Sequence, residues 1–330
     1  MANVQKLLPA GLLLFGIAFA VRAQHSEPLH QVGTIALPGV EGRIDHLSID
    51  IKNQRLFVCA LGNNTLEVLD VRNRTRLHTI SGLREPQGVL YAPATNRLYV
   101  ANGGDGSLRI FDAATFGLLK TVAYGDDADN VRYDPAASLV WTGYGSGALG
   151  AIDKDGVKAT EIRLDAHPES FQLEKSGRRI FVNLPRSRKI AVLDRDSRAV
   201  ITAWNTGDAS ENFPMALDES HQRLIVVCRA PTRMMVLDTG TGKTVASLPV
   251  VGDSDDVFYD QQRKRLYATG GEGAISVVEQ QDPDHYREIA RIQTVKGART
   301  GFYSPDLDRL FVAVRKQGSQ PAEIRIYQPQ

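Results

Sequence analysis

The chain has 330 residues, of which 42% are hydrophobic and 23% are charged, and its formal net charge is +1 at pH 7. This is the composition of an ordinary globular protein, and no overall charge favours binding to nucleic acid or to an anionic membrane. The two cysteines, Cys59 and Cys228, form no CxxC or CxxCH motif, which excludes covalent c-type haem and a cysteine-rich zinc site. Both lie in apolar runs and are expected to be buried thiols.

The first segment of the chain has the pattern of a signal peptide. Lys6 precedes an apolar stretch from Leu7 to Val21, and Val21 and Ala23 supply the small residues of a cleavage site. We therefore expect residues 1–23 to be a signal peptide and residues 24–330 to form the mature protein, in the periplasm or secreted. An uncleaved anchor is the alternative. After this segment no apolar run reaches 18 residues, so no membrane span is expected in the mature chain.

A repeated strand pattern follows along the rest of the chain. An R-L-aromatic-V-like segment recurs every 40 to 44 residues, starting at Arg55, Arg97, Leu139, Arg179, Arg223, Arg265 and Arg309. After each of these segments comes a turn rich in Gly or Asn and a second apolar segment, such as LEVLD at 66–70 and MMVLD at 234–238. Short β-type segments with this period are the signature of a propeller built from four-stranded blades.

The two ends of the chain complement each other. The seventh repeat stops at Gln330, after its third strand, while Gly33–Gly39 resembles a fourth strand and precedes the first repeat. We therefore predict an all-β fold, a single seven-bladed β-propeller over residues 24–330 with four-stranded antiparallel blades. The N-terminal strand completes the last blade and closes the ring, which removes an exposed sheet edge.

Two repeated features are expected to be structural. An Asp ends the third strand of five repeats and should cap the following turn through backbone amides. The Arg that opens most of the second-strand segments recurs too regularly to be catalytic and should tie neighbouring blades or turns. The five Asp residues are Asp70, Asp112, Asp153, Asp194 and Asp238.

With RLYVAN at 97–102 as the closest copy, the repeats resemble the YVTN-type β-propeller repeat. Residues 30–330 look like a YncE-like exported seven-bladed propeller. This resemblance implies the fold but no activity, because such propellers mostly lack an assigned function, and the same shape serves lactonases, dehydrogenases and interaction modules.

Polar residues differ between repeats at the positions where each first strand should begin, at the mouth of the central channel. Ten residues before the second-strand start stand Asp45, Gln87, Asp129, Glu169, Phe213, Asp255 and Arg299. His46, Asn130 and Asp256 follow directly after three of these, and His167 lies two residues before Glu169. Because these positions break the symmetry of the repeat, the predicted ligand-binding set is Asp45, His46, Gln87, Asp129, Asn130, His167, Glu169, Asp255, Asp256 and Arg299.

Three interpretations of this set remain open: a solvated polar mouth, a site for a polar ligand or protein partner, and a divalent metal site. In the metal interpretation, Asp45, Asp129, Glu169 and Asp255 hold Ca²⁺ or Mg²⁺, because carboxylate oxygens suit these ions. Carboxylates this close together need a cation, a proton or solvent between them.

The favoured function is a non-enzymatic binding module, expected to be monomeric, for a small polar ligand or an unknown protein. The alternative is a metal-dependent, lactonase-like hydrolase in which the cation activates water and His46 or His167 acts as general base. A redox-associated propeller is a further alternative. No G-x-S-x-G motif supports a serine hydrolase. No basic, aromatic-bearing groove is evident, so nucleic acid is not an expected partner.

Overall fold

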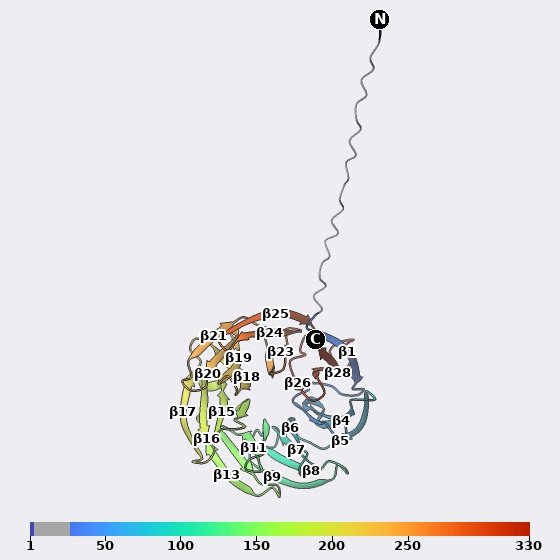
Figure 1. Cartoon of the computed structure of the whole chain (residues 1–330). Helices are drawn as coiled ribbons and strands as arrows, with labels where there is room; N and C mark the ends of the chain where they lie inside the picture. The colour runs from blue at the N-terminus through green and yellow to red at the C-terminus, as the bar shows by residue number, and fades with distance from the viewer. Residues whose placement is uncertain (3–26) are drawn as a thin grey trace.

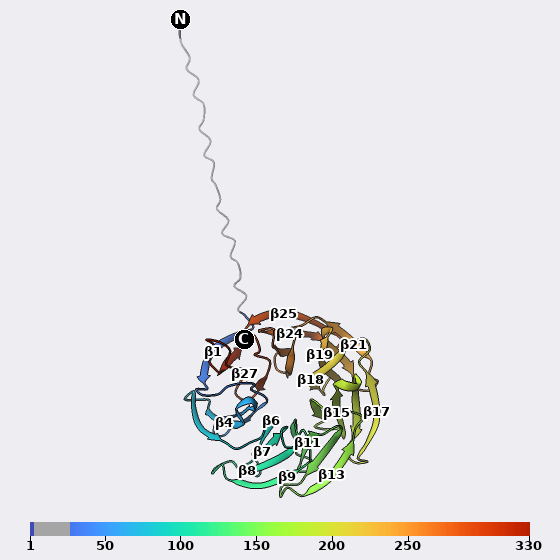
Figure 2. The same cartoon turned by 180° about the vertical axis from the view of Figure 1, so that it is seen from behind.

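A computed structural model describes residues 1–2 and 27–330. The predicted signal peptide lies mostly outside the described residues. In the described part of the chain, 28 strands form seven four-stranded antiparallel sheets, with two short 3₁₀ turns at Leu61–Asn63 and Pro185–Ser187. The sheets are arranged as the blades of a propeller around a central axis (Figures 1 and 2). The fold class predicted from the repeats is therefore confirmed.

Within the first six blades, the strands follow one another in chain order from the axis to the rim, so consecutive strands pair as hairpins. In the first three blades the strands are β2 (Leu47–Asp50), β3 (Arg55–Ala60), β4 (Thr65–Asp70), β5 (Thr75–Ile80), β6 (Pro86–Ala92), β7 (Arg97–Asn102), β8 (Ser107–Asp112), β9 (Leu118–Ala123), β10 (Val131–Asp134), β11 (Leu139–Tyr144), β12 (Ala148–Ile152) and β13 (Lys158–Arg163). In the next three they are β14 (Phe171–Leu173), β15 (Arg179–Leu184), β16 (Lys189–Asp194), β17 (Ala199–Asn205), β18 (Ser210–Asp218), β19 (Arg223–Ala230), β20 (Thr232–Asp238), β21 (Thr244–Leu248), β22 (Ser254–Asp260), β23 (Arg265–Gly270), β24 (Ala274–Asp282) and β25 (His285–Gln293).

The last blade joins the two ends of the described chain. It consists of β26 (Gly301–Ser304), β27 (Arg309–Val314), β28 (Glu323–Pro329) and, at the rim, β1 (Leu29–Ala36). β1 pairs antiparallel with β28, and Leu29 lies opposite Pro329 and Ile35 opposite Ile324. Figure 1 shows β1 beside the C-terminus, as ring closure by an N-terminal strand requires.

The core lies between the blades. Seven clusters of buried apolar side chains each combine residues of two neighbouring blades. The third residue of each second strand packs inside one of these clusters and has at most 1% of its surface exposed. These residues are Phe57, Tyr99, Trp141, Phe181, Ile225, Tyr267 and Phe311. Burial of large side chains against the next sheet is the main stabilising term of such a ring.

The repeated charged residues have the structural roles that their regularity indicates. The Asp at the end of each of five third strands accepts backbone N–H groups of the next turn; Asp112, for example, binds the amides of Ala114 and Thr115 at 2.9 and 2.8 Å. Arg55 reaches the carbonyl oxygen of Ala113 in the next blade at 2.6 Å, and Arg179 reaches that of Thr239 at 2.5 Å. Each such hydrogen bond joins one blade to its neighbour.

Both cysteines are buried and free, as their apolar surroundings indicate. Burial raises the pKa of the Cys59 thiol well above its ordinary value, so this thiol is inert at neutral pH. Among the described residues, no helix is long and apolar enough to cross a membrane.

Candidate functional site

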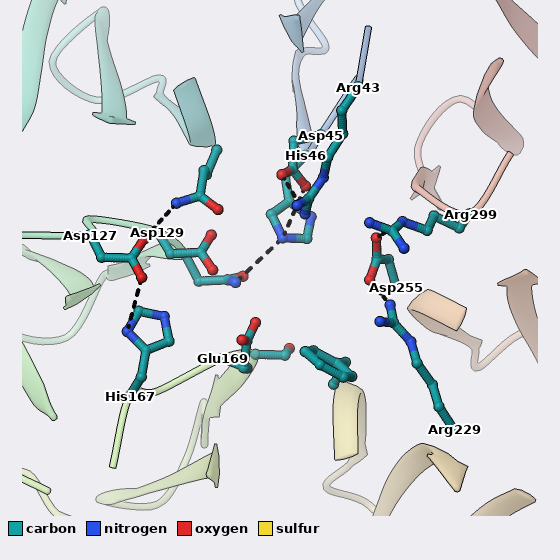
Figure 3. A pocket seen from close by; sticks show the side chains of 14 residues that line it. Arg43, Asp45, His46, Asp127, Asp129, His167, Glu169, Arg229, Asp255 and Arg299 are labelled. Carbon is teal, nitrogen blue, oxygen red and sulfur yellow. Dashed lines mark hydrogen bonds and ion pairs between the residues drawn. The ribbon is translucent and has the colours of Figure 1, made fainter. Parts of the chain in front are cut away.

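A polar pocket of about 280 Å³ opens at one mouth of the central channel. Its walls come from all seven blades: from the segments that precede β2, β10, β14 and β26, from the innermost strands β6, β18 and β22, and from the end of β19. Figure 3 shows side chains from different blades converging on it. The lining residues are Arg43, Asp45, His46, Gln87, Asp127, Asp129, Asn130, His167, Glu169, Ser170, Phe213, Arg229, Asp255 and Arg299.

The structure brings nine of the ten predicted ligand-binding residues into this pocket. The tenth, Asp256, follows Asp255 in the sequence and lines a second cavity, deeper in the channel. His46 lines this second cavity too. The pocket also contains three charged residues that the sequence analysis missed, Arg43, Asp127 and Arg229.

The sequence carried a signal for each of the missed residues. Arg43 and Asp127 stand two residues before Asp45 and Asp129, and side chains two apart in an extended segment face the same side. Arg229 comes six residues after the start of its second-strand segment, where three other repeats hold Gly.

On one side of the pocket, arginines compensate the carboxylates. Arg299 Nε lies 2.6 Å from Asp255 Oδ2, and Arg229 pairs with the other oxygen of the same carboxylate. Arg43 Nη2 lies 2.8 Å from Asp45 Oδ2. Figure 3 shows Asp255 held between its two arginines. These ion pairs compensate the charges of Asp45 and Asp255 within the protein, although Oδ2 of each accepts no hydrogen bond and burial still raises the pKa of Asp45.

His46 lies at the floor of the pocket among three carboxylates. Its Nδ1 is 3.6 Å from Asp256 Oδ1, and its Nε2 is 3.9 Å from Asp45 Oδ1. Burial favours the neutral ring, but attraction to Asp256, Asp45 and Asp129 outweighs burial and raises the pKa of His46 to about 10. His46 is therefore an imidazolium at neutral pH and cannot serve as a general base in this state.

The amide of Asn130 completes the surroundings of His46. It lies 3.3 Å from His46 Nε2, and its buried Oδ1 otherwise has no partner. Because an imidazolium only donates hydrogen bonds, the Asn130 amide orientation that presents Oδ1 to Nε2 satisfies both groups.

On the opposite wall, Asp129 and Glu169 form no ion pair among the described residues, although attraction to His46 acts on both from a longer distance. Among residues 27–330, no arginine, lysine or histidine lies within 4.0 Å of Asp129 or Glu169, and neither carboxylate has a hydrogen-bond partner. Asp129 is only 6% exposed. Figure 3 shows both side chains pointing into the pocket. Their neighbour Asp127 is different, since it accepts a hydrogen bond from Gln87 Nε2 at 2.9 Å and lies 3.6 Å from His167 Nδ1.

These two carboxylates have raised pKa values for two reasons. Burial is the larger cause for both, and it raises the pKa of Asp129 and of Glu169 to about 7. Repulsion adds to burial, from Glu169 in the case of Asp129, and from Asp255 and Asp45 in the case of Glu169. Near neutral pH this wall therefore holds protons that an incoming cation would displace.

The four carboxylates predicted as ligands of Ca²⁺ or Mg²⁺ differ in their partners. In the described part of the chain, no three His, Cys, Asp or Glu side chains are placed to hold one ion. Of the four carboxylates considered as ligands, Asp45 and Asp255 are already paired with arginines, which leaves only Asp129 and Glu169. A Ca²⁺ or Mg²⁺ ion bound by these two carboxylates would take its other oxygen ligands from water, and the metal site stays a prediction.

No protein-family model matches the chain, and no curated protein is similar to it in sequence. Solved structures similar to it include the hydrazine synthase of Kuenenia stuttgartiensis, with 16% identity and a TM-score of 0.73 over 84% of this chain and 95% of that one. Another is a chain in the crystal structure of a mitotic checkpoint complex, with 13% identity and a TM-score of 0.78 over 98% of this chain and 99% of that one. At such identities the similarity concerns the fold alone. The chain is a seven-bladed β-propeller protein with a charged pocket at its channel mouth.

Proposed function

We propose that the protein is an exported, monomeric binding module that takes a small ligand with a cationic group at the channel mouth. The YVTN-like repeats, with RLYVAN at 97–102 as the best copy, support its placement among YncE-like propellers. The signal-peptide pattern of residues 1–23 supports a periplasmic or secreted location.

The unpaired carboxylates of Asp129 and Glu169 are the observation that carries this proposal. Buried charges in proteins are normally paired, because an uncompensated one costs several kcal/mol. Here the protein pairs Asp45 and Asp255 with its own arginines but leaves Asp129 and Glu169 facing the cavity. An ammonium or guanidinium group placed between them would supply the missing partner.

The other lining residues limit the size and shape of the ligand. A pocket of about 280 Å³ lies just below the usual range for small-molecule sites, so it suits a ligand of few heavy atoms. Phe213 adds an aromatic side chain to the pocket, and the guanidinium carbon of Arg229 lies 4.0 Å from its ring centroid. A small organic amine matches this combination better than a bare metal ion does.

Melting curves test the proposal. The full chain is heated with and without small amines such as ethylamine, putrescine and glycine ethyl ester, and with their neutral hydroxyl analogues. We expect amines, and not the neutral analogues, to raise the melting temperature in a saturable manner, since a ligand that binds only the folded state stabilises it. The double variant Asp129→Asn, Glu169→Gln should lose this response. Equal responses of the variant and the parent protein would contradict the assignment.

A further inference from the structure

Below the mouth, the channel is lined by one residue from each blade. These side chains stand seven positions before the start of each second-strand segment, and six of the seven line a cavity of about 210 Å³. The seven equivalent residues are Ser48, Leu90, Arg132, Gln172, Ala216, Phe258 and Phe302. Four are apolar and two are neutral polar, so Arg132 is the single charge in this ring.

Arg132 has little in the protein to compensate it. Its Nη1 donates a hydrogen bond to the carbonyl oxygen of Val131 at 3.0 Å, and its guanidinium carbon lies 5.6 Å from the ring centroid of Phe171. Within residues 27–330, no carboxylate lies within 4.0 Å of it. Burial lowers the pKa of Arg132, and only longer-range attraction from Asp256 and Asp129 opposes this.

The acid that shares the cavity is already engaged. Asp256 Oδ2 accepts a hydrogen bond from the amide of Gly301 at 2.9 Å, and its Oδ1 faces His46 Nδ1 at 3.6 Å. His46, Arg132 and Asp256 are the charged residues that line this cavity in the described chain. With His46 protonated, the wall carries two positive charges and one negative charge. One monovalent anion would neutralise the remaining positive charge.

The remaining lining residues suit a short carboxylic acid. Ser48 Oγ accepts the amide of Tyr91 at 2.9 Å, which leaves its hydroxyl proton free to donate. Gln172 Nε2 uses one N–H on the carbonyl oxygen of Met215, at 3.0 Å, and keeps the other. The edge-to-face pair Phe258 and Phe302, with ring centroids 6.4 Å apart, supplies an apolar surface across the same cavity.

We propose that the channel cavity beneath His46 is a binding site for a small monocarboxylate, held by the guanidinium of Arg132. The planar guanidinium matches a carboxylate with two parallel hydrogen bonds, a geometry that neither chloride nor a neutral amide can reproduce. The phenyl rings then face the short alkyl part of the acid. This site shares His46 with the channel-mouth pocket, but it does not depend on the function proposed for that pocket.

Isothermal titration of the full chain with sodium acetate and sodium propionate tests this site. The titrations are made at pH 7 with ionic strength held constant by chloride, and acetamide and propionamide serve as neutral analogues. We expect saturable binding of both acids and no binding of the amides. Loss of a charge-assisted pair should weaken acetate binding by about tenfold or more in Arg132→Gln. The control variant Arg163→Gln also removes a positive charge, but Arg163 is exposed on the outer strand β13, so it should bind acetate within about twofold of the parent protein.

Either of two results would overturn the proposal. One is the absence of saturable acetate binding to the parent protein, which would mean that water alone solvates Arg132. The other is equal affinity in Arg132→Gln, which would place the anion elsewhere. If Arg132→Gln does not fold, Arg132→Lys takes its place. Lysine keeps the positive charge but lacks the planar guanidinium group with its two parallel N–H donors, so acetate binding should weaken by a smaller factor. Unchanged binding would again count against the site.

Discussion

Individual carboxylates at the channel mouth differ in what compensates their charge. Asp255 lies between two arginines and Asp45 beside one, whereas Asp129 and Glu169 face the cavity without a partner among the described residues. Such an arrangement lowers the stability of the empty protein, because desolvation of an unpaired carboxylate is unfavourable. Unfavourable placement of this kind is typical of residues retained for binding.

The raised pKa of Asp129 has a definite consequence for stability. Its folded-state pKa, about 7, lies above the unfolded value of about 3.9, so the folded state binds the proton more tightly than the unfolded state. The free energy of unfolding should therefore fall as the pH rises from about 4 to about 7. Replacement by Asn removes this penalty, and Asp129→Asn should gain about 1–3 kcal/mol at pH 8 and much less at pH 4.5.

Urea denaturation at these two pH values measures this effect. Asp155→Asn is the matched control, because Asp155 is exposed and should give nearly the same small change at both pH values. A gain in Asp129→Asn that is equal at pH 4.5 and pH 8 would show that its carboxylate is not the titrating group.

At the scale of strands and turns, the repeated arginines have unequal energetic roles. Arg55 binds the carbonyl oxygen of Ala113 in the next blade at 2.6 Å and pairs with buried Asp50 at 2.7 Å. Arg97 occupies the equivalent position, but its acidic partner, Asp155, is exposed and lies at 3.7 Å.

Arg55→Met should therefore lower the free energy of unfolding by about 2–4 kcal/mol, since it leaves Asp50 without its cation and a carbonyl oxygen without its donor. Arg97→Met should cost less than about 1 kcal/mol, as is usual for exposed ion pairs. Chemical denaturation of both variants compares the two positions directly. Equal losses would mean that the inter-blade hydrogen bond of Arg55 contributes little.

Strands and channel-mouth residues could be predicted because each depends on position in the repeat. Counting back from Arg265 and Arg309 was enough to find Asp255 and Arg299. Which charges pair could not be predicted in this way, because Asp255 meets Arg229 from a neighbouring blade through a long, flexible side chain. Asp129 has no arginine partner because no guanidinium group reaches it. The repeat pattern does not show how far each arginine side chain reaches.

For the whole molecule, closure of the ring depends on β1. This strand covers the edge of β28 and buries Ile35 completely in the layer between the last and first blades. Every blade then has four strands and contacts two neighbours, and the third strand of the last blade is not left as an edge.

Ile35→Ala should lower the free energy of unfolding by about 2–4 kcal/mol, the usual cost of a cavity in a packed core. Val32→Ala in the same strand is the matched control, because Val32 is 37% exposed and should cost less than about 1 kcal/mol. Thermal unfolding of the two variants provides the comparison. A small effect of Ile35→Ala would mean that the ring does not depend on packing of its closing strand.

Asp129 and Glu169 are proposed to bind the cationic group of a small ligand. The most direct test is isothermal titration of the full chain with the amine that raises its melting temperature most, at pH 5.5 and pH 8. Because the amine must displace protons from carboxylates with pKa values of about 7, affinity should be higher at pH 8 by about tenfold or more, with protons released on binding near pH 7. Affinity that is independent of pH, or equal in the Asp129→Asn, Glu169→Gln variant, would contradict the claim.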